Sequence, residues 1–167
     1  MKTLALIRHG KSSWDDPERK DIDRPLNPRG RRNAPEMGER LAGRGQTPDL
    51  LLSSPARRAR DTAGIIARAI NYPESDLKLE HSLYLADSTT LLKLVHRLPA
   101  ELDEVWIVGH NPDLTEFANS LGDFETDNMP TCAICRFSFE VSHWYEVKPG
   151  SGTLREYDTP KHPWQPA

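Results

Sequence analysis

Short apolar runs alternate with longer amphipathic segments along this chain, and the alternation predicts its secondary structure. Residues 3–7 are aliphatic and partly β-branched, residues 49–52 and 105–108 are again apolar, and a short run at 77–79 resembles them. Apolar runs of this length are typical of strands buried on both faces. Because the strands alternate with helical segments, we expect a single α/β domain of three layers (α/β/α) with a mostly parallel central sheet.

Helix-start residues and apolar positions at helical spacing place the helices. Asn27 is a good N-cap for a helix that begins at residue 28 and ends near residue 43 or 45. Pro35 lies inside this helix, so we expect a kink or a later start near Asn33. Further helices are expected, with their start residues, at 56–70 (Ser54, Pro55), 88–98 (Ser88) and 113–121 (Pro112).

The carboxyl-terminal part of the chain predicts an edge to the sheet and then a tail. Residues 133–139 and 144–147 are expected to pair as antiparallel strands across a turn near Ser142. The last segment is too rich in proline for regular structure. We therefore expect one domain over residues 1–158 and a Pro-rich tail over residues 159–167.

Length and charge exclude several classes of protein. At 167 residues the chain fits one domain, and its net charge of −3 provides no field that would attract nucleic acid. The apolar run at the start is shorter than a secretory or membrane segment requires. The sequence predicts a soluble, cytoplasmic protein without nucleic-acid or membrane partners, and it leaves the oligomeric state open.

Cys132 and Cys135 form a C-x-x-C pair, the spacing found in redox and metal sites. The residues around them have the pattern of a strand, in which positions three apart face opposite sides. We therefore expect two buried structural thiols that point away from each other.

Chemistry-bearing residues follow the predicted strands. Arg8-His9-Gly10 follows the first strand, and His110 follows the strand at 105–108. Arg57 and Arg58 lie in the first turn of the helix after the strand at 49–52, where free amides favour an anion. Since ligands bind at the carboxyl ends of parallel strands, these side chains are expected at one edge of the sheet. Position alone leaves open which of the two arginines faces the site.

This set of side chains suits phosphoryl transfer. An imidazole serves as the nucleophile when one ring nitrogen is free and the other is held as N–H. Arginines bind phosphoryl oxygens through paired N–H groups, and a protonated His110 would add a further cationic donor. The sequence has neither a P-loop nor an H-E-x-x-H motif, so we expect no cofactor and no metal.

Three motifs together resemble the histidine phosphatase superfamily, which has the phosphoglycerate mutase-like fold. They are Arg8-His9-Gly10, the run from Ser54 to Thr62, and Gly109-His110-Asn111-Pro112. The stretch 23–30 and the small size are similar to the compact SixA-type phosphohistidine phosphatase branch. The similarity spans residues 3 to about 121.

The resemblance implies specific roles. His9 would be the phosphorylated nucleophile, and Arg8 and His110 would hold the phosphoryl group. The family's S-x-x-x-R-A-x-x-T spacing selects Arg58 over Arg57. Two neighbours in the motifs complete the expected substrate-binding set, Ser12 and Asn111.

One family feature is missing. Larger members have a glutamate that acts as a general acid after the middle helix. Here the corresponding stretch, residues 83–86, has no carboxylate. The nearby carboxylates of Glu80, Asp87 and Asp16 do not match the family pattern. An alkoxide leaving group needs a proton from such an acid, but an imidazole departs readily as a neutral base. The expected function is a metal-independent phosphatase that acts on a phosphohistidine-bearing phosphotransfer protein through phospho-His9.

Two alternatives remain. The chain would act on small phosphate esters if a nearby carboxylate supplied the proton, and it would be a phosphate-binding module if His9 had no chemical role. The charged loop 11–24, with Trp14, is expected to border the site, where Trp14 would line the pocket or anchor the loop.

Overall fold

A computed structural model describes residues 1–166; residue 167, the last of the predicted tail, lies outside the described residues. Six strands form one sheet in the order β3-β2-β4-β1-β5-β6. The strands are β1 (Lys2–Arg8), β2 (Leu50–Ser53), β3 (Lys78–Leu79), β4 (Glu104–Gly109), β5 (Ile134–Phe139) and β6 (Thr153–Asp158). The α-helices are α1 (Pro28–Gly43), α2 (Arg57–Ala69), α3 (Ser88–His96) and α4 (Asp113–Leu121), and four short 3-10 helices are η1 (Asp21–Asp23), η2 (Glu74–Asp76), η3 (His81–Leu83) and η4 (Trp144–Glu146).

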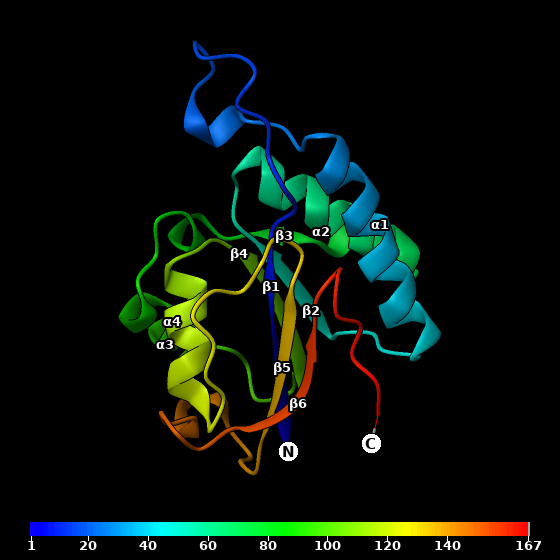
Figure 1. Ribbon diagram of the computed structural model, residues 1–167. Helices are drawn as coiled ribbons and strands as arrows, with labels where there is room; N and C mark the ends of the chain where they lie inside the picture. The colour runs from blue at the N-terminus through cyan, green and yellow to red at the C-terminus, as the bar shows by residue number, and fades with distance from the viewer. Residues whose placement is uncertain (167) are drawn as a thin grey trace.

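The helices lie on both faces of the sheet, α1 and α2 on one and α3 and α4 on the other (Figure 1). Strand β1 supplies side chains to both layers: Leu4 and Leu6 belong to the α3/α4 core, and Ala5 and Ile7 to the α1/α2 core. The pairs β1–β4, β2–β4 and β2–β3 are parallel, and β1–β5 and β5–β6 are antiparallel. The predicted three-layer α/β/α fold with a mostly parallel sheet is confirmed.

Helix α1 begins where its cap predicts. The Asn27 side chain accepts a hydrogen bond from the Gly30 amide at 2.9 Å, and Pro28 is the first helical residue. The helix continues through Pro35, so the expectation of a later start near Asn33 is wrong. Burial of Met37 and its neighbours against α2 outweighs the one backbone hydrogen bond that proline cannot make.

The predicted caps of two other helices are wrong. Helix α2 begins at Arg57, after Pro55, and Ala56 rather than Ser54 stands at its N-cap. The cap of α3 is Asp87, whose carboxylate accepts the Thr90 amide at 2.7 Å, and Ser88 is the first helical residue. A carboxylate at a helix start also interacts favourably with the helix dipole.

The last edge of the sheet differs from the prediction. Residues 144–147 form no strand; η4 occupies 144–146, and the strand that pairs with β5 is β6, at 153–158. Trp144 and Val147 are both fully buried and lie three residues apart, which suits a helical turn. After β6 the chain continues from Thr159 to Pro166 without helix or strand, as expected for this stretch.

The two cysteines lie on opposite sides of the sheet. Cys132 belongs to the α1/α2 core and Cys135 to the α3/α4 core, so the predicted divergence of the thiols is confirmed. Both are free, and burial raises the pKa of each thiol, that of Cys132 to about 12. Among residues 1–166, no helix has the length and apolar character needed to cross a membrane.

Candidate active site

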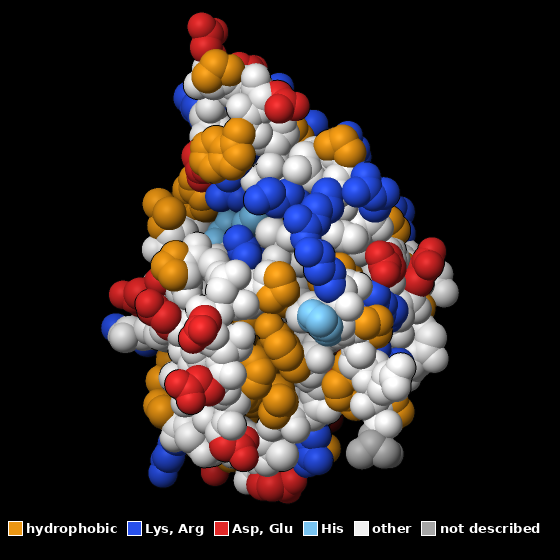
Figure 2. Space-filling view, in the orientation of Figure 1, with side chains coloured by type: hydrophobic (Ala, Val, Ile, Leu, Met, Phe, Trp, Pro, Cys, Tyr) orange, Lys and Arg blue, Asp and Glu red, His pale blue; other side chains and the backbone are white. Residues whose placement is uncertain are grey.

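A cavity of about 230 Å³ lies at the carboxyl ends of the central strands. In Figure 2, histidine surface is visible between Lys and Arg side chains, below the part of the molecule that projects upward. We call this cavity the histidine pocket; it is lined by Arg8, His9, Lys11, Ser12, Trp14, Arg24, Arg58, Tyr84, Leu85, His110, Asn111 and Thr131.

The order of the strands brings the predicted residues together. Strands β2, β4 and β1 are neighbours in the sheet and run parallel, so the segments that follow them meet at one edge. His9 follows β1, His110 follows β4, and Arg58 lies in the first turn of α2 after β2. The rings of His9 and His110 are 5.0 Å apart between centroids.

His9 has the geometry of a neutral imidazole with one free nitrogen. Its Nδ1 lies 2.6 Å from the carbonyl oxygen of Gly10, which can only accept, so Nδ1 carries the hydrogen. Burial of the ring lowers the pKa of His9 to about 3. At neutral pH, Nε2 therefore has an unprotonated lone pair, which is what a nucleophile needs.

His110 is also neutral, but here Nε2 rather than Nδ1 makes the hydrogen bond within the protein. Burial, followed by the charge of Arg58, lowers the pKa of His110 to about 4, so it is not the cationic donor that the sequence suggested. Its Nε2 lies 2.7 Å from the hydroxyl oxygen of Ser54, which also accepts the Ala56 amide. When the Ser54 hydroxyl donates to Nε2, Nδ1 keeps the hydrogen and becomes a neutral donor.

Two arginines, Arg8 half-buried and Arg58 buried, supply the positive charge. Arg8 donates from Nη1 to the Met129 carbonyl at 2.8 Å, and Arg58 is only 6% exposed. Among residues 1–166, three buried nitrogens in the pocket's side chains have no hydrogen-bond partner, namely Nε of Arg8, Nε of Arg58 and Nδ1 of His110. Buried donors without partners are costly, so a concentration of them in one cavity indicates an anion-binding site.

The remaining predicted residues are placed as follows. Arg57 lies outside the histidine pocket and pairs with Asp61 at 3.6 Å on the surface. Ser12 is buried in the lining. The side chain of Asn111 is in the lining, but it donates to Met129 and accepts from Thr115, so its hydrogen bonds hold the loop at 128–129 against the start of α4.

Two residues near the arginines were not predicted from the sequence. The carboxylate of Asp21, in η1, accepts hydrogen bonds from Arg58 and from the hydroxyl of Tyr84, which lines the pocket. Burial opposes the ionisation of Asp21, but the hydrogen bonds from Tyr84, Arg58 and Arg24 and the charge of Arg58 outweigh it and lower its pKa to about 2. No local signal marks either residue, since the contacts join positions 37 and 63 residues apart.

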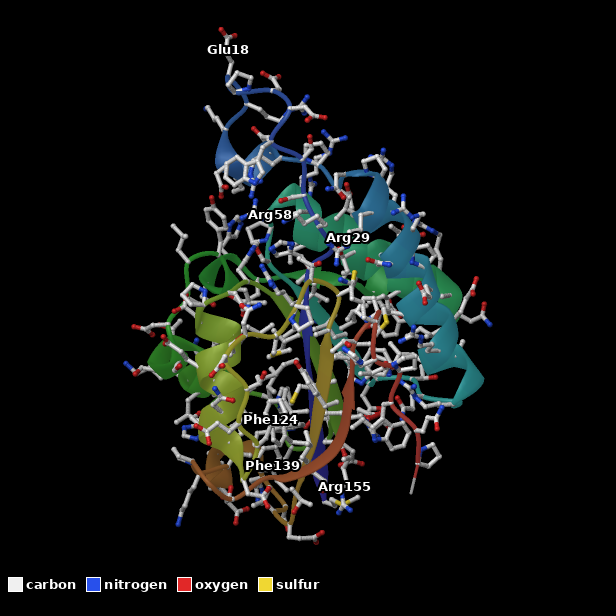
Figure 3. The ribbon with its side chains drawn as sticks, in the orientation of Figure 1. Glu18, Arg29, Arg58, Phe124, Phe139 and Arg155 are labelled. Atoms are coloured by element: carbon white, nitrogen blue, oxygen red, sulfur yellow. The ribbon has the colours of Figure 1, made fainter. Side chains whose placement is uncertain are left out.

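Loop 11–24 projects from the body of the molecule above the pocket, with Glu18 at its tip (Figures 1 and 3). Trp14 lines the pocket, is 72% exposed and lies against Arg24, whose guanidinium carbon is 3.4 Å from the ring centroid. Trp14 thus lines the pocket, and its contact with Arg24 joins the two ends of the loop itself. Among residues 1–166, no three His, Cys, Asp or Glu side chains gather closely enough to hold a metal ion.

Comparisons with known proteins agree with this geometry. The model of the histidine phosphatase superfamily (branch 1) matches residues 4–84. An uncharacterized protein of Mycobacterium tuberculosis is 31% identical over 168 residues, covering 93% of this chain and 100% of the relative. A metal-independent phosphoserine phosphatase of Arabidopsis thaliana is 37% identical over 84 residues, 47% of this chain and 35% of that protein.

Among solved structures, one from Agrobacterium tumefaciens, provisionally named as the phosphohistidine phosphatase SixA, aligns with a TM-score of 0.81 and 27% identity over 95% of this chain and 97% of that one. The chain belongs to the histidine phosphatase superfamily and is a phosphatase of that superfamily. Within it, the chain falls in the compact SixA-type branch.

Proposed function

We propose that this phosphatase hydrolyses phosphohistidine on a phosphotransfer protein, with His9 as the phosphorylated nucleophile. The observation that carries the proposal is the absence of a proton donor suited to an alkoxide. Within residues 1–166, no carboxyl group lines the histidine pocket, and Asp21, next to it, stays ionised because its pKa is about 2. A P–N bond does not need such a donor, since neutral imidazole leaves readily.

The reaction would proceed in two displacements. The phosphoryl oxygens bind Nε of Arg8, Nε of Arg58 and Nδ1 of His110, the buried donors without partners. The Nε2 lone pair of His9 forms a bond to phosphorus as the P–N bond of the substrate breaks. The electron pair of that bond leaves with the substrate imidazole, which departs neutral when its other nitrogen carries a proton. Water then attacks the phosphorus of phospho-His9, and the P–Nε2 bond breaks with its electron pair returning to His9, whose Nδ1 keeps its hydrogen. Both hydrogens of the water leave with the phosphoryl group as dihydrogen phosphate.

The mouth of the pocket suits a side chain that projects from a protein. Two large apolar side chains at the mouth are exposed, Trp14 at 72% and Leu85 at 81%. Exposed apolar side chains beside a charged pocket are typical of surfaces that contact a partner protein. These features support a protein-borne substrate.

A second candidate is a phosphatase of small phosphate esters. The similarity to the Arabidopsis phosphoserine phosphatase favours it, and the hydroxyl of Tyr84 is a weak acid that lines the pocket. Burial and the neighbouring Asp21 raise the pKa of Tyr84, however, so this hydroxyl is a poor proton donor to an alkoxide.

The test compares phosphate release from a phosphohistidine-bearing phosphotransfer domain and from a phosphoserine protein, without added metal. We expect kcat/KM to be at least about 100-fold higher for phosphohistidine, the range in which a missing general acid penalises the ester. The His9→Gln variant is the negative control, and His143→Gln, at an exposed ring, is the matched control. Equal rates on both substrates would favour the ester phosphatase, and full activity of His9→Gln would exclude the covalent route.

A further inference from the structure

We propose that Asp21 is a positioning residue, which fixes the guanidinium of Arg58 in the orientation that binds the phosphoryl group. The proposal rests on the proposed function in one respect, that Arg58 binds the transferred phosphoryl group. It adds a residue from outside the pocket lining to the machinery, and it connects that machinery to loop 11–24.

Asp21 holds Arg58 at two points. Nη1 of Arg58 donates to the Asp21 carbonyl oxygen at 2.8 Å, and Nη2 donates to the Asp21 carboxylate at 3.1 Å. The Nε–H remains buried without a partner among residues 1–166, and the side chain lines the histidine pocket. The contact with Asp21 therefore orients the guanidinium while a donor stays available for the ligand.

The carboxylate is itself held from two further segments. The Tyr84 hydroxyl, which follows η3, donates to the same carboxylate oxygen as Arg58, at 2.6 Å. Nε of Arg24 donates to the other oxygen at 3.1 Å, and Arg24 lies against the ring of Trp14. Asp21 is thus held by two residues that line the pocket, Tyr84 and Arg24, and Figure 3 places Arg58 directly below the projecting loop.

Positioning matters because an arginine side chain has about 2 kcal/mol of rotamer freedom to lose. A guanidinium that is already oriented does not lose this freedom when the transition state forms, and a displacement of 1 Å can cost about 100-fold in rate. A simple electrostatic role predicts the opposite effect. Removing a negative charge beside the pocket would then favour the anionic substrate and raise activity.

The experiment is a double-mutant cycle in the full chain, with Asp21→Asn introduced into the wild-type protein and into Arg58→Ala. Rates are measured with the phosphohistidine domain and with p-nitrophenyl phosphate, under single-turnover conditions so that slow variants stay measurable. Asp23→Asn is the matched control, because Asp23 lies in η1 and its side chain makes no hydrogen bond or ion pair within residues 1–166.

We expect Asp21→Asn to lower kcat/KM by about 10- to 100-fold in the wild-type background. In the Arg58→Ala background it should lower it by less than about threefold, because residues that act through one another are not additive. Equal losses in both backgrounds, a gain of activity, or an effect no larger than that of Asp23→Asn would overturn the proposal. The double-mutant cycle can be measured with either substrate, so a wild-type protein that shows no preference for phosphohistidine overturns only the proposed function. A wild-type protein that is inactive on both substrates overturns the proposed function and the role of Asp21.

Discussion

At the residue scale, both histidines of the pocket are neutral for the same reason, but each leaves a different ring nitrogen free for the substrate. His9 is buried and His110 is partly buried, and the loss of solvent, with the nearby arginine charges, lowers their pKa values to about 3 for His9 and about 4 for His110. The Gly10 carbonyl holds the hydrogen of His9 on Nδ1, while Ser54 contacts Nε2 of His110. One ring is thereby prepared as a nucleophile, and the other can donate a hydrogen bond without a positive charge.

This burial predicts a pH dependence of stability. In the unfolded chain a histidine binds a proton near pH 6.5, whereas folded His9 resists protonation until about pH 3. The unfolded state therefore binds more protons below pH 6.5, and the free energy of unfolding falls with the pH. Between pH 6.5 and 5, His9 alone should remove up to about 2 kcal/mol.

Urea denaturation at pH 7, 6 and 5 measures this effect. The His9→Gln variant should lose less stability on acidification than the wild-type protein, while His143→Gln, whose side chain is 47% exposed, should behave as the wild type does. An identical pH dependence in all three proteins would show that the buried ring does not control it.

The residue scale also marks the limit of prediction from the sequence. Arg8 ends β1, His9 and His110 directly follow β1 and β4, and Arg58 lies in the first turn of α2. All four belong to recognisable motifs, so their meeting in one pocket was predictable. Asp21 has no such motif, because it lies in a charged loop with several other acidic residues and differs from them only in its distant contacts. Side chains that act through long-range contacts are not visible to local patterns.

At the element scale, helices α1 and α2 fix the turn that carries His9. The Thr62 hydroxyl of α2 accepts the Gly10 amide at 2.9 Å and donates to the Arg58 carbonyl at 2.7 Å. The start of α1 packs against the backbone of Lys11, where Gly30 leaves room for close approach. The turn after β1 is therefore held by both helices of one face.

Two glycines of α1 give a matched test of this packing. A Cβ at Gly30 would overlap the carbonyl oxygen of Lys11, whereas a Cβ at Gly43 meets nothing within 4 Å. We expect Gly30→Ala to lower stability by about 1–3 kcal/mol and to lower activity by displacing the turn. Gly43→Ala should instead raise stability by about 0.5–1 kcal/mol and leave activity unchanged, because alanine favours a helix.

Thermal unfolding and phosphatase assays of both variants distinguish these outcomes. A Gly30→Ala protein with wild-type stability and rate would mean that the start of α1 does not fix the turn. Destabilisation by Gly43→Ala would point to a contact of residue 43 that helix propensity does not describe.

Elements with an apolar pattern were predictable, and the one strand without it was not. Strand β6 is an edge strand whose buried positions include the charged residues Glu156 and Asp158. Charged side chains at inward positions remove the hydrophobic alternation by which strands are recognised. The strand was instead predicted at the apolar residues Trp144 and Val147, which form one side of a helical turn.

At the scale of the whole molecule, the buried carboxylate of Asp158 joins β6, at the edge of the sheet, to α1, and α1 in turn contacts the tail. Asp158, at the end of β6, is fully buried and accepts hydrogen bonds from Arg40 at 2.8 Å and from Arg44 at 3.1 Å. Arg40 also donates to the carbonyls of Thr159 and Pro160. The tail is thus tied to α1 through backbone groups, which explains how a proline-rich stretch stays against the body without regular structure.

This cluster yields a prediction about stability that is separate from catalysis. Asp158→Asn would remove the buried carboxylate that Arg40 and Arg44 share, leaving Arg44 with the more distant Glu156 at 3.6 Å, and breaking a buried ion pair typically costs about 3–5 kcal/mol. Glu36→Gln removes the exposed partner of the same Arg40, at 2.7 Å with its carboxylate 48% exposed, and should cost less than about 1 kcal/mol. Chemical denaturation of both variants measures the difference.

The same variant should keep its activity. Because Asp158, Arg40 and Arg44 lie outside the lining of the histidine pocket, kcat/KM of Asp158→Asn at a temperature where it stays folded should remain within about threefold of wild type. Equal stabilities of the two variants would mean that α1 and β6 are held together by apolar packing alone, and a large loss of activity in a folded Asp158→Asn protein would mean that the tail reaches the site.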